Sequence, residues 1–139
     1  MNDIIVGVDR SETAMNAARR AAELAAAFGV NLHLVMCADR GKAVNIKVGS
    51  ESFHTDWLSE VEQHLAEVSR KLPHDSITTK IDTGDPAKTL IEEAERLGAR
   101  AIVVGNRRVQ GASRVLGSIA SDVLRKAPCD VLVANTIEA

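Results

Sequence analysis

Residues 101–135 read AIVVGNRRVQGASRVLGSIASDVLRKAPCDVLVAN. This stretch has the pattern of a strand, a glycine-bearing loop, a helix and a second strand. Ile102–Gly105 is apolar at every position, which is typical of a strand buried between two layers of helices. Residues 118–127 form the expected helix, which Pro128 ends, and the apolar run 129–134 predicts the closing strand.

The loop between the first strand and the helix is polar and ends at Gly117-Ser118. A glycine allows a ligand to approach the backbone, and a serine at this place caps a helix or bonds a ligand. The free N–H groups and the positive dipole end of a helix bind anions. The stretch therefore predicts either a site for a phosphate-bearing ligand or a plain helix cap, and both interpretations stay open here.

The rest of the chain repeats the alternation of strands and helices. Strands are expected at residues 3–9, 30–38 and 76–82, and helices from Ser11 to Phe28, from Thr55 or Asp56 to about Leu72, and from Asp85 to Gly98. Residues 39–54 are expected to form a loop. With right-handed crossovers, this order predicts an α/β fold, in which helices cover both faces of a doubly wound parallel sheet. One domain spanning residues 1–139 is expected.

Composition limits the classes of partner. The formal net charge of −2 and the scarcity of aromatic residues argue against a nucleic-acid partner. No apolar run is long enough for a membrane span, and the first residues do not resemble a signal peptide, so a cytoplasmic protein is expected. Cys37 and Cys129 lie in apolar strands and are expected to be reduced core thiols.

The expected topology brings two distant segments together. Ligands of doubly wound sheets bind beyond the carboxyl ends of the strands, where the winding reverses. If the first and fourth strands are neighbours there, Asp9 faces the loop after Gly105 across a crevice. Capping of the first helix by Asp9 is the alternative interpretation.

Four segments together resemble the UspA-type universal stress proteins. They are IIVGVDRSETA from Ile4, GDPAKTLIEEA from Gly84, AIVVGNRR from Ala101 with GASRVLGSIASDVL from Gly111, and APCDVLVANT from Ala127. The resemblance covers nearly the whole chain. It implies the strand order 3-2-1-4-5, and a homodimer joined through the last strand, here residues 129–135. It also implies binding of ATP or another adenine nucleotide.

The resemblance also implies a set of site residues. Asp9 matches an acid that helps to hold the adenine end, and Val35 falls where members contact adenine through the backbone. Gly105 and the pair Gly117-Ser118 match the ends of a phosphate and ribose loop of the form G-x2-G-x9-G-[ST]. The complete expected set is Val8, Asp9, Val35, Gly105, Asn106, Arg107, Arg108, Gly117, Ser118 and Ile119.

Two positions depart from the family pattern. Arg108 stands where the second loop glycine is expected, with eight residues between it and Gly117, and Arg10 replaces a common glycine. The Arg108 side chain either fills the phosphate space or, with Arg107, donates charge-assisted bonds to phosphate oxygens. Alternatively, Gly111 takes over the close approach to the ligand.

The sequence supports binding better than catalysis. It has no nucleophile–base–orienter set at a recognisable spacing, and His54, His64 and His74 are not spaced as metal ligands, so neither catalytic residues nor a metal are expected. The first hypothesis is a nucleotide-responsive regulatory protein of the stress response. The second is a nucleotide-free dimeric module that binds an unidentified protein, and the third is a slow nucleotide hydrolase.

Overall fold

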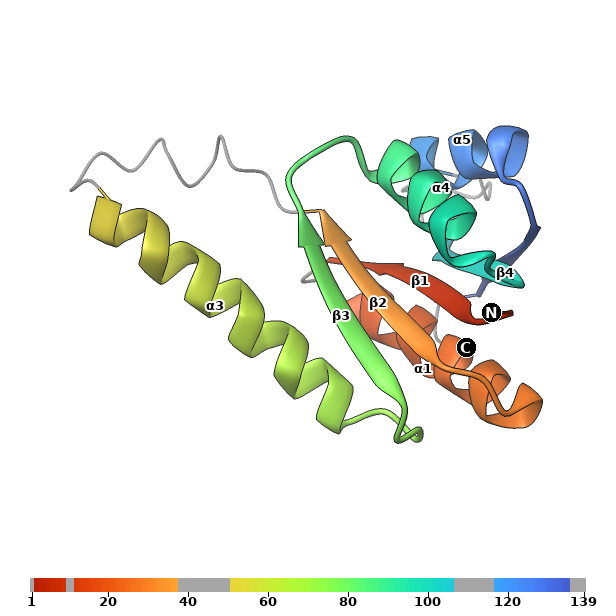
Figure 1. The fold of residues 1–139 in the computed structure, drawn as a ribbon, viewed down its shortest axis with the longest axis horizontal. Helices are drawn as coiled ribbons and strands as arrows, with labels where there is room; N and C mark the ends of the chain where they lie inside the picture. The colour runs from red at the N-terminus through yellow and green to blue at the C-terminus, as the bar shows by residue number, and fades with distance from the viewer. Residues whose placement is uncertain (1, 10–11, 38–50, 107–116, 136–139) are drawn as a thin grey trace, which may run out of the picture.

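The five strands form one parallel sheet in the order β3-β2-β1-β4-β5. The structure is a computed structural model, and it describes residues 2–9, 12–37, 51–106 and 117–135. The strands are β1 (Ile4–Val8), β2 (Leu32–Cys37), β3 (Ile77–Asp82), β4 (Ala101–Gly105) and β5 (Asp130–Ala134) (Figure 1). The predicted order 3-2-1-4-5 is therefore confirmed, and β3 lies at one edge of the sheet.

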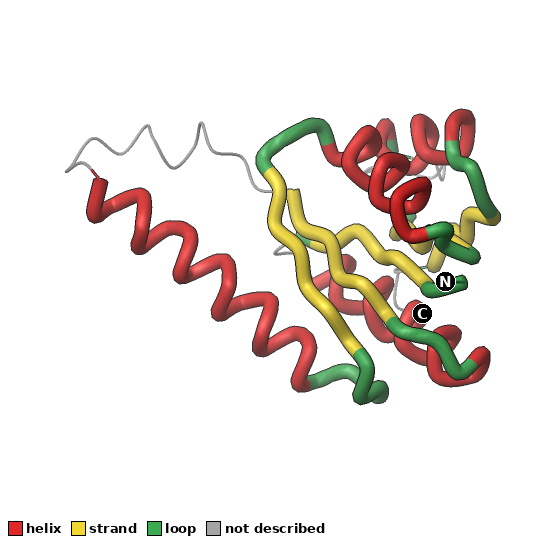
Figure 2. Tube along the Cα trace, viewed as in Figure 1, coloured by secondary structure: helices red, strands yellow, loops and turns green. Residues whose placement is uncertain are grey.

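Helices cover both faces of this sheet, as the alternation predicted (Figures 1 and 2). They are α1 (Glu12–Phe28), α3 (Glu51–Arg70), α4 (Pro86–Leu97) and α5 (Ser118–Lys126). Helices α1 and α3 share one buried cluster with the sheet, and α4 and α5 share the other. Helix α1, which follows β1, lies on one face of the sheet, and α5, which follows β4, lies on the other. The winding therefore reverses between β1 and β4.

The central strand β1 supplies both buried clusters because its side chains alternate between the faces. Ile4 and Val6 point toward α1 and α3, whereas Ile5 points toward α4 and α5, and all three are fully buried. Ile5 lies opposite Ile102 of β4 in the parallel register. Small alanines on the buried face of α1 allow the helix to approach the sheet closely.

The ends of α4 are capped at the two residues that bound the predicted helix. Asp85 is the N-cap, and its carboxylate accepts a hydrogen bond of 2.9 Å from the backbone N–H of Lys88. Pro86 is the first helical residue, where a missing N–H costs nothing. Gly98 ends the helix at φ 59°, the left-handed conformation that glycine adopts without strain.

Some predicted boundaries were wrong. Helix α3 begins at Glu51, whereas residues 51–54 were expected to belong to a loop and the helix to start at Thr55 or Asp56. The first turn is mostly polar, so the apolar spacing that signals a helix appears only from Trp57 onward. Strand ends differ by one or two residues; β5, for example, begins at Asp130 and not at Cys129. Residues 39–50 of the expected loop lie outside the described residues.

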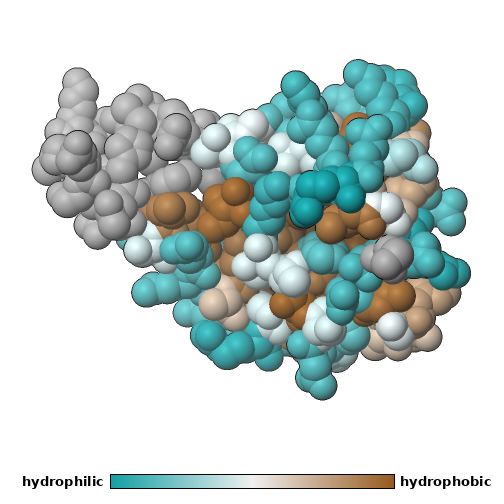
Figure 3. All heavy atoms as spheres, viewed as in Figure 1, coloured by the Kyte–Doolittle hydropathy of each residue, from teal (hydrophilic) through white to brown (hydrophobic). Residues whose placement is uncertain are grey.

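The outer surface is mixed in character. On the side that Figure 3 presents, hydrophobic side chains show in separate areas among polar ones. Among the residues whose exposure the structure describes, the large apolar side chains that are more than one third exposed are Phe28, Leu58, Ile119, Leu124 and Leu132. The guanidinium of Arg100 lies over the ring of Phe28, 3.8 Å from the ring centroid, so this aromatic side chain is partly covered. Among the described helices, none is long and apolar enough to cross a membrane.

Candidate functional site

A pocket of about 260 Å³ opens where the winding of the sheet reverses. Strands β1 and β4 are neighbours in the parallel sheet, so their carboxyl ends meet at the same edge. The pocket is lined there by Gly7, Val8, Asp9, Ala14, Val35, Cys37, Pro86, Leu90, Val104, Gly105, Asn106, Gly117, Ser118, Ile119 and Ala120. Segments almost 100 residues apart in the sequence therefore contribute to one hollow.

The pocket brings together most of the residues that the sequence singled out. Its lining includes the predicted Val8, Asp9, Val35, Gly105, Asn106, Gly117, Ser118 and Ile119. Arg107 and Arg108 lie outside the described residues, as do Arg10 and Gly111. The fold thus places Asp9 and the start of α5 at one pocket, while their roles toward a ligand stay predictions.

Sequence reasoning missed the wall that α4 contributes. Pro86 and Leu90 line the pocket because the crossover helices run antiparallel to the strands, which puts the first turns of α4 beside the strands' carboxyl ends. Leu90 packs onto β1 over Gly7, where an added Cβ would lie 3.0 Å from Leu90 Cδ1. The sequence Asp85-Pro86 marks where α4 begins. Which strand lies beside this end of the helix, however, follows only from the order of the strands in the sheet.

The start of α5 differs from the start of α4. The N-cap is Gly117, with extended backbone at φ −66° and ψ 164°, and no side chain caps the helix. Ser118 was expected to cap, but it is the first helical residue and it is exposed. Gly117 has no side chain that could accept hydrogen bonds from the first N–H groups of α5. These N–H groups adjoin the pocket.

Asn106 is held in place at the end of β4. Its backbone N–H donates to the carbonyl of Ala134 at 3.1 Å, and its side-chain amide donates to Asn135 Oδ1 at 3.4 Å. These bonds tie the point where the chain leaves β4 to the end of β5. The backbone around Gly105 therefore lines the pocket from a fixed position.

The wall formed by Cys37 is uncharged. Burial is the main cause that raises the pKa of the Cys37 thiol, and the nearby carboxylates of Asp82 and Asp85 raise it further. A hydrogen bond with Thr89 acts in the opposite direction but does not outweigh them. Cys37 thus lines the pocket as a neutral, half-buried thiol at physiological pH.

The described side chains form no obvious metal site. Within the described ranges, no group of three or more His, Cys, Asp and Glu residues is arranged to hold a metal ion. The pocket itself combines one carboxylate, small or apolar walls and a helix N-terminus. Such a combination suits an organic ligand that carries hydrogen-bond donors at one end and an anionic group at the other.

Comparison with known proteins identifies the family. The family model described as the universal stress protein family matches residues 1–135. The chain belongs to the universal stress protein family. The resemblance noted in the four sequence segments is thereby confirmed.

Individual relatives agree with this assignment. A universal stress protein of Methanocaldococcus jannaschii is 30% identical over 137 residues, which cover 95% of this chain and 81% of the relative. The crystal structure of a universal stress protein in complex with cAMP is 26% identical, with a TM-score of 0.68 and coverage of 98% of both chains. A universal stress protein of Archaeoglobus fulgidus in complex with dAMP shares the fold, at 23% identity, a TM-score of 0.65 and coverage of 96% and 97%.

Proposed function

We propose that this universal stress protein is a regulatory protein that binds an adenine nucleotide, ATP or a related one, in the pocket between β1, β4 and α5. The observation that carries the proposal is the position of the pocket. It lies at the reversal of the winding, with Asp9 on one side and the start of α5 on the other. The similar universal stress protein solved with cAMP supports the choice of ligand class.

The pocket's two sides suit the two ends of a nucleotide. The N–H groups of the first turn of α5, at Ser118 and Ile119, would bind phosphate oxygens, and Gly105 and Gly117 would let the phosphate approach the backbone. The carboxylate of Asp9 can only accept hydrogen bonds when ionised, so it suits the ribose hydroxyls or the adenine amino group. Val8 and Val35 would contact the base.

The size and polarity of the walls fit the proposal. A volume of about 260 Å³ lies just below the usual range of small-molecule pockets, roughly 300–1,000 Å³. Leu90, Val104 and the neutral thiol of Cys37 would pack against the flat faces of the base without leaving a buried charge unpaired. Arg107 and Arg108 adjoin Asn106 in the sequence, and their contribution to phosphate binding stays a prediction.

Thermal unfolding with and without ATP, ADP, AMP and cyclic AMP tests the proposal. A ligand at about 100 times its Kd stabilises the folded state by roughly 2.7 kcal/mol, which raises the Tm by several degrees for a domain of this size. We expect a rise with at least one nucleotide. No rise with any of the four at millimolar concentration would reject the proposal.

Paired variants locate the ligand. Asp9→Asn is expected to weaken nucleotide binding, whereas Asp130→Asn, at the exposed start of β5, is its control and should leave the Kd unchanged. Isothermal titration calorimetry of both variants gives the comparison. Equal Kd values for the parent and Asp9→Asn would contradict the placement of the ribose or adenine beside Asp9.

The edge strand β5 supports a second candidate function, a dimeric module that acts on a protein partner without nucleotide. Strand β5 pairs with β4 alone in the described sheet, and Leu132 on it is 41% exposed. An open edge with an apolar side chain favours pairing with a second copy. A dimer by light scattering that Leu132→Lys converts to a monomer would support this interface, and a monomeric parent at micromolar concentration would contradict it.

Slow nucleotide hydrolysis is the weakest of the three hypotheses. Asp9 is the pocket's carboxylate that could orient a water molecule. We expect phosphate release from ATP to be no faster in the parent than in Asp9→Ala. A clear loss of phosphate release in that variant would instead assign an enzymatic activity to the pocket.

A further inference from the structure

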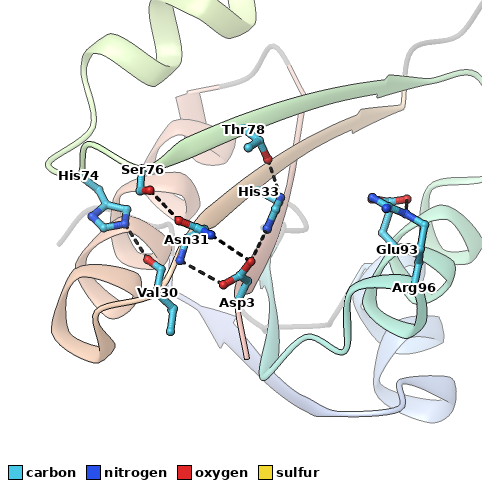
Figure 4. A network of polar contacts seen from close by, with 9 residues as sticks. All are labelled: Asp3, Val30, Asn31, His33, His74, Ser76, Thr78, Glu93 and Arg96. Atoms are coloured by element: carbon cyan, nitrogen blue, oxygen red, sulfur yellow. Dashed lines mark hydrogen bonds and ion pairs between the residues drawn. The ribbon is translucent and has the colours of Figure 1, made fainter. Parts of the chain in front are cut away.

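A second group of polar side chains lies at the opposite end of the sheet from the pocket, where β1, β2 and β3 begin (Figure 4). His33 of β2 is the direct register partner of Thr78 in β3, so the two side chains share one face of the sheet. Asp3 lies just before β1 on the same face. Figure 4 shows the imidazole of His33 between the Thr78 hydroxyl and the Asp3 carboxylate.

The Asp3 carboxylate is firmly oriented. One oxygen accepts a hydrogen bond of 3.2 Å from the backbone N–H of Asn31, and the other accepts a bond of 3.4 Å from the Asn31 amide. Burial acts to raise the pKa of Asp3, but the hydrogen bonds from His33 and Asn31 outweigh it and hold the pKa below its usual value. Asp3 is therefore ionised at neutral pH and can only accept hydrogen bonds.

This orientation fixes the tautomer of neutral His33. Nε2 of His33 lies 2.8 Å from Asp3 Oδ2, and since the carboxylate has no proton to give, Nε2 carries the hydrogen. Nδ1 then has a lone pair, which is aimed at the Oγ1 of Thr78 within hydrogen-bond distance. The Thr78 hydroxyl consequently donates a hydrogen bond to Nδ1.

The three groups have the arrangement of a nucleophile, a base and an orienting carboxylate. Thr78 is exposed, whereas the side chains of His33 and Asp3 are only 15% and 9% exposed. A hydroxyl that donates to an imidazole held by a carboxylate is the activated nucleophile of acyl-transfer chemistry. The set lies outside the nucleotide pocket and shares no residue with it.

We propose that the Thr78 hydroxyl, with His33 as its base and Asp3 as the group that orients His33, is a site of covalent acylation by small activated esters. The neighbouring Thr79 provides an internal comparison, because consecutive residues of a strand point to opposite faces. Thr79 is also exposed, and it lies away from the face that carries His33.

The chemical step balances without a further reactant. Thr78 Oγ1 attacks the acyl carbon of the ester and forms a new C–O bond, while its proton moves to Nδ1 of His33. The bond between the acyl carbon and the leaving oxygen breaks, and the leaving group departs with the electron pair. His33 then returns the proton to solvent, and Thr78 carries the acyl ester. The Asp3 carboxylate stabilises the transient imidazolium through the 2.8 Å contact.

The probe is p-nitrophenyl acetate, and the protein is the full chain. Released p-nitrophenolate gives the rate, and intact mass spectrometry counts the acetyl groups. Peptide mapping locates them, and hydroxylamine removes an ester on Thr78 but leaves amides on lysines. We expect an acetyl ester on Thr78 that forms at least about 100-fold faster than any on Thr79, the lower range of general-base catalysis.

Variants separate chemistry from folding. Thr78→Val keeps the β-branched shape and should abolish the ester, Thr78→Ser should retain it, and Thr79→Val should match the parent. His33→Gln should lower the rate at Thr78 about 100-fold or more; thermal unfolding of each variant checks that it is folded. Acetylation of lysines alone in the parent, or an equal rate at position 78 in the folded His33→Gln variant, would overturn the proposal.

Discussion

The carboxylate of Glu93 connects α4 to the edge strand β3 and offers a sharp test of the structure. Its side chain is only 7% exposed, and Oε1 lies 2.6 Å from the Lys80 Nζ of β3. Arg96, one turn further along α4, donates to both carboxylate oxygens, at 3.0 and 2.8 Å. The charge-assisted bonds from Arg96 are the largest cause that lowers the pKa of Glu93 to about 2, with Lys80 adding to them against the cost of burial.

The depressed pKa has a calculable effect on stability. A fall from 4.5 to about 2, at about 1.36 kcal/mol for each pKa unit, corresponds to about 3 kcal/mol of stability at neutral pH. Because the folded-state pKa is the lower one, this contribution is present above the unfolded-state pKa of about 4.5 and is lost as the pH falls toward 2. Between pH 7 and pH 3, about 2 kcal/mol of it disappears.

The substitution Glu93→Gln removes the titrating group and keeps its size. We expect the variant to be about 2–3 kcal/mol less stable than the parent at pH 7, since Lys80 and Arg96 lose their ionic partner. The difference should shrink by about 2 kcal/mol at pH 3. Urea unfolding followed by circular dichroism at pH 7, 5, 4 and 3 measures both quantities.

Glu92→Gln is the matched control, because Glu92 is the exposed neighbour on the same helix. It should follow the parent within about 0.5 kcal/mol over the whole range. If Glu93→Gln loses as much stability as the parent between pH 7 and pH 3, the buried ionised carboxylate does not exist and the packing of α4 on β3 is misassigned.

Three further predictions concern packing and helix ends. Ala21→Leu should lower the free energy of unfolding, measured with urea, by about 1–3 kcal/mol, because Ala21 is fully buried on the face of α1 that packs on the sheet. Its control, Glu23→Leu on the exposed face of the same helix, should change the stability little. Asp85→Ala should cost about 1 kcal/mol through loss of the 2.9 Å cap to Lys88, and an unchanged stability would mean that the cap is not formed in solution. Gly98→Ala should lower the Tm by an amount that corresponds to about 1 kcal/mol, since the backbone at φ 59° strains any side chain. Gly84→Ala is its control, because Gly84 does not have a left-handed φ.

The fold could be predicted from local signals in the amino-acid sequence. The periodicity of a strand or helix is visible within about ten residues, so its signals are local. Examples are the apolar runs of β1 and β4, the alanines of α1 and the helix start at Asp85-Pro86. The order 3-2-1-4-5 came from the resemblance to the universal stress proteins, and the sheet has that order. Helix α3 started earlier than expected because a polar first turn carries no apolar period.

The pocket was predicted in part. Asp9, Gly105 and Gly117 were found from motifs that are short in sequence, and they line one hollow. Leu90 and Cys37 were missed, because their place at the pocket depends on which strands α4 adjoins and on where β2 ends.

The contacts between distant side chains depend on how the helices and strands pack in three dimensions. Asp3 and His33 are 30 residues apart, and His33 and Thr78 are 45 apart, so no motif could have joined them. Parallel pairing of β2 with β3 sets His33 opposite Thr78, and a slip of one residue would have turned one of them to the other face. Likewise, the register of β3 brings Lys80 to the buried carboxylate of Glu93, where it adds to the stabilisation that Arg96 provides. Local chemistry fixed which elements form, and strand register fixed which side chains meet.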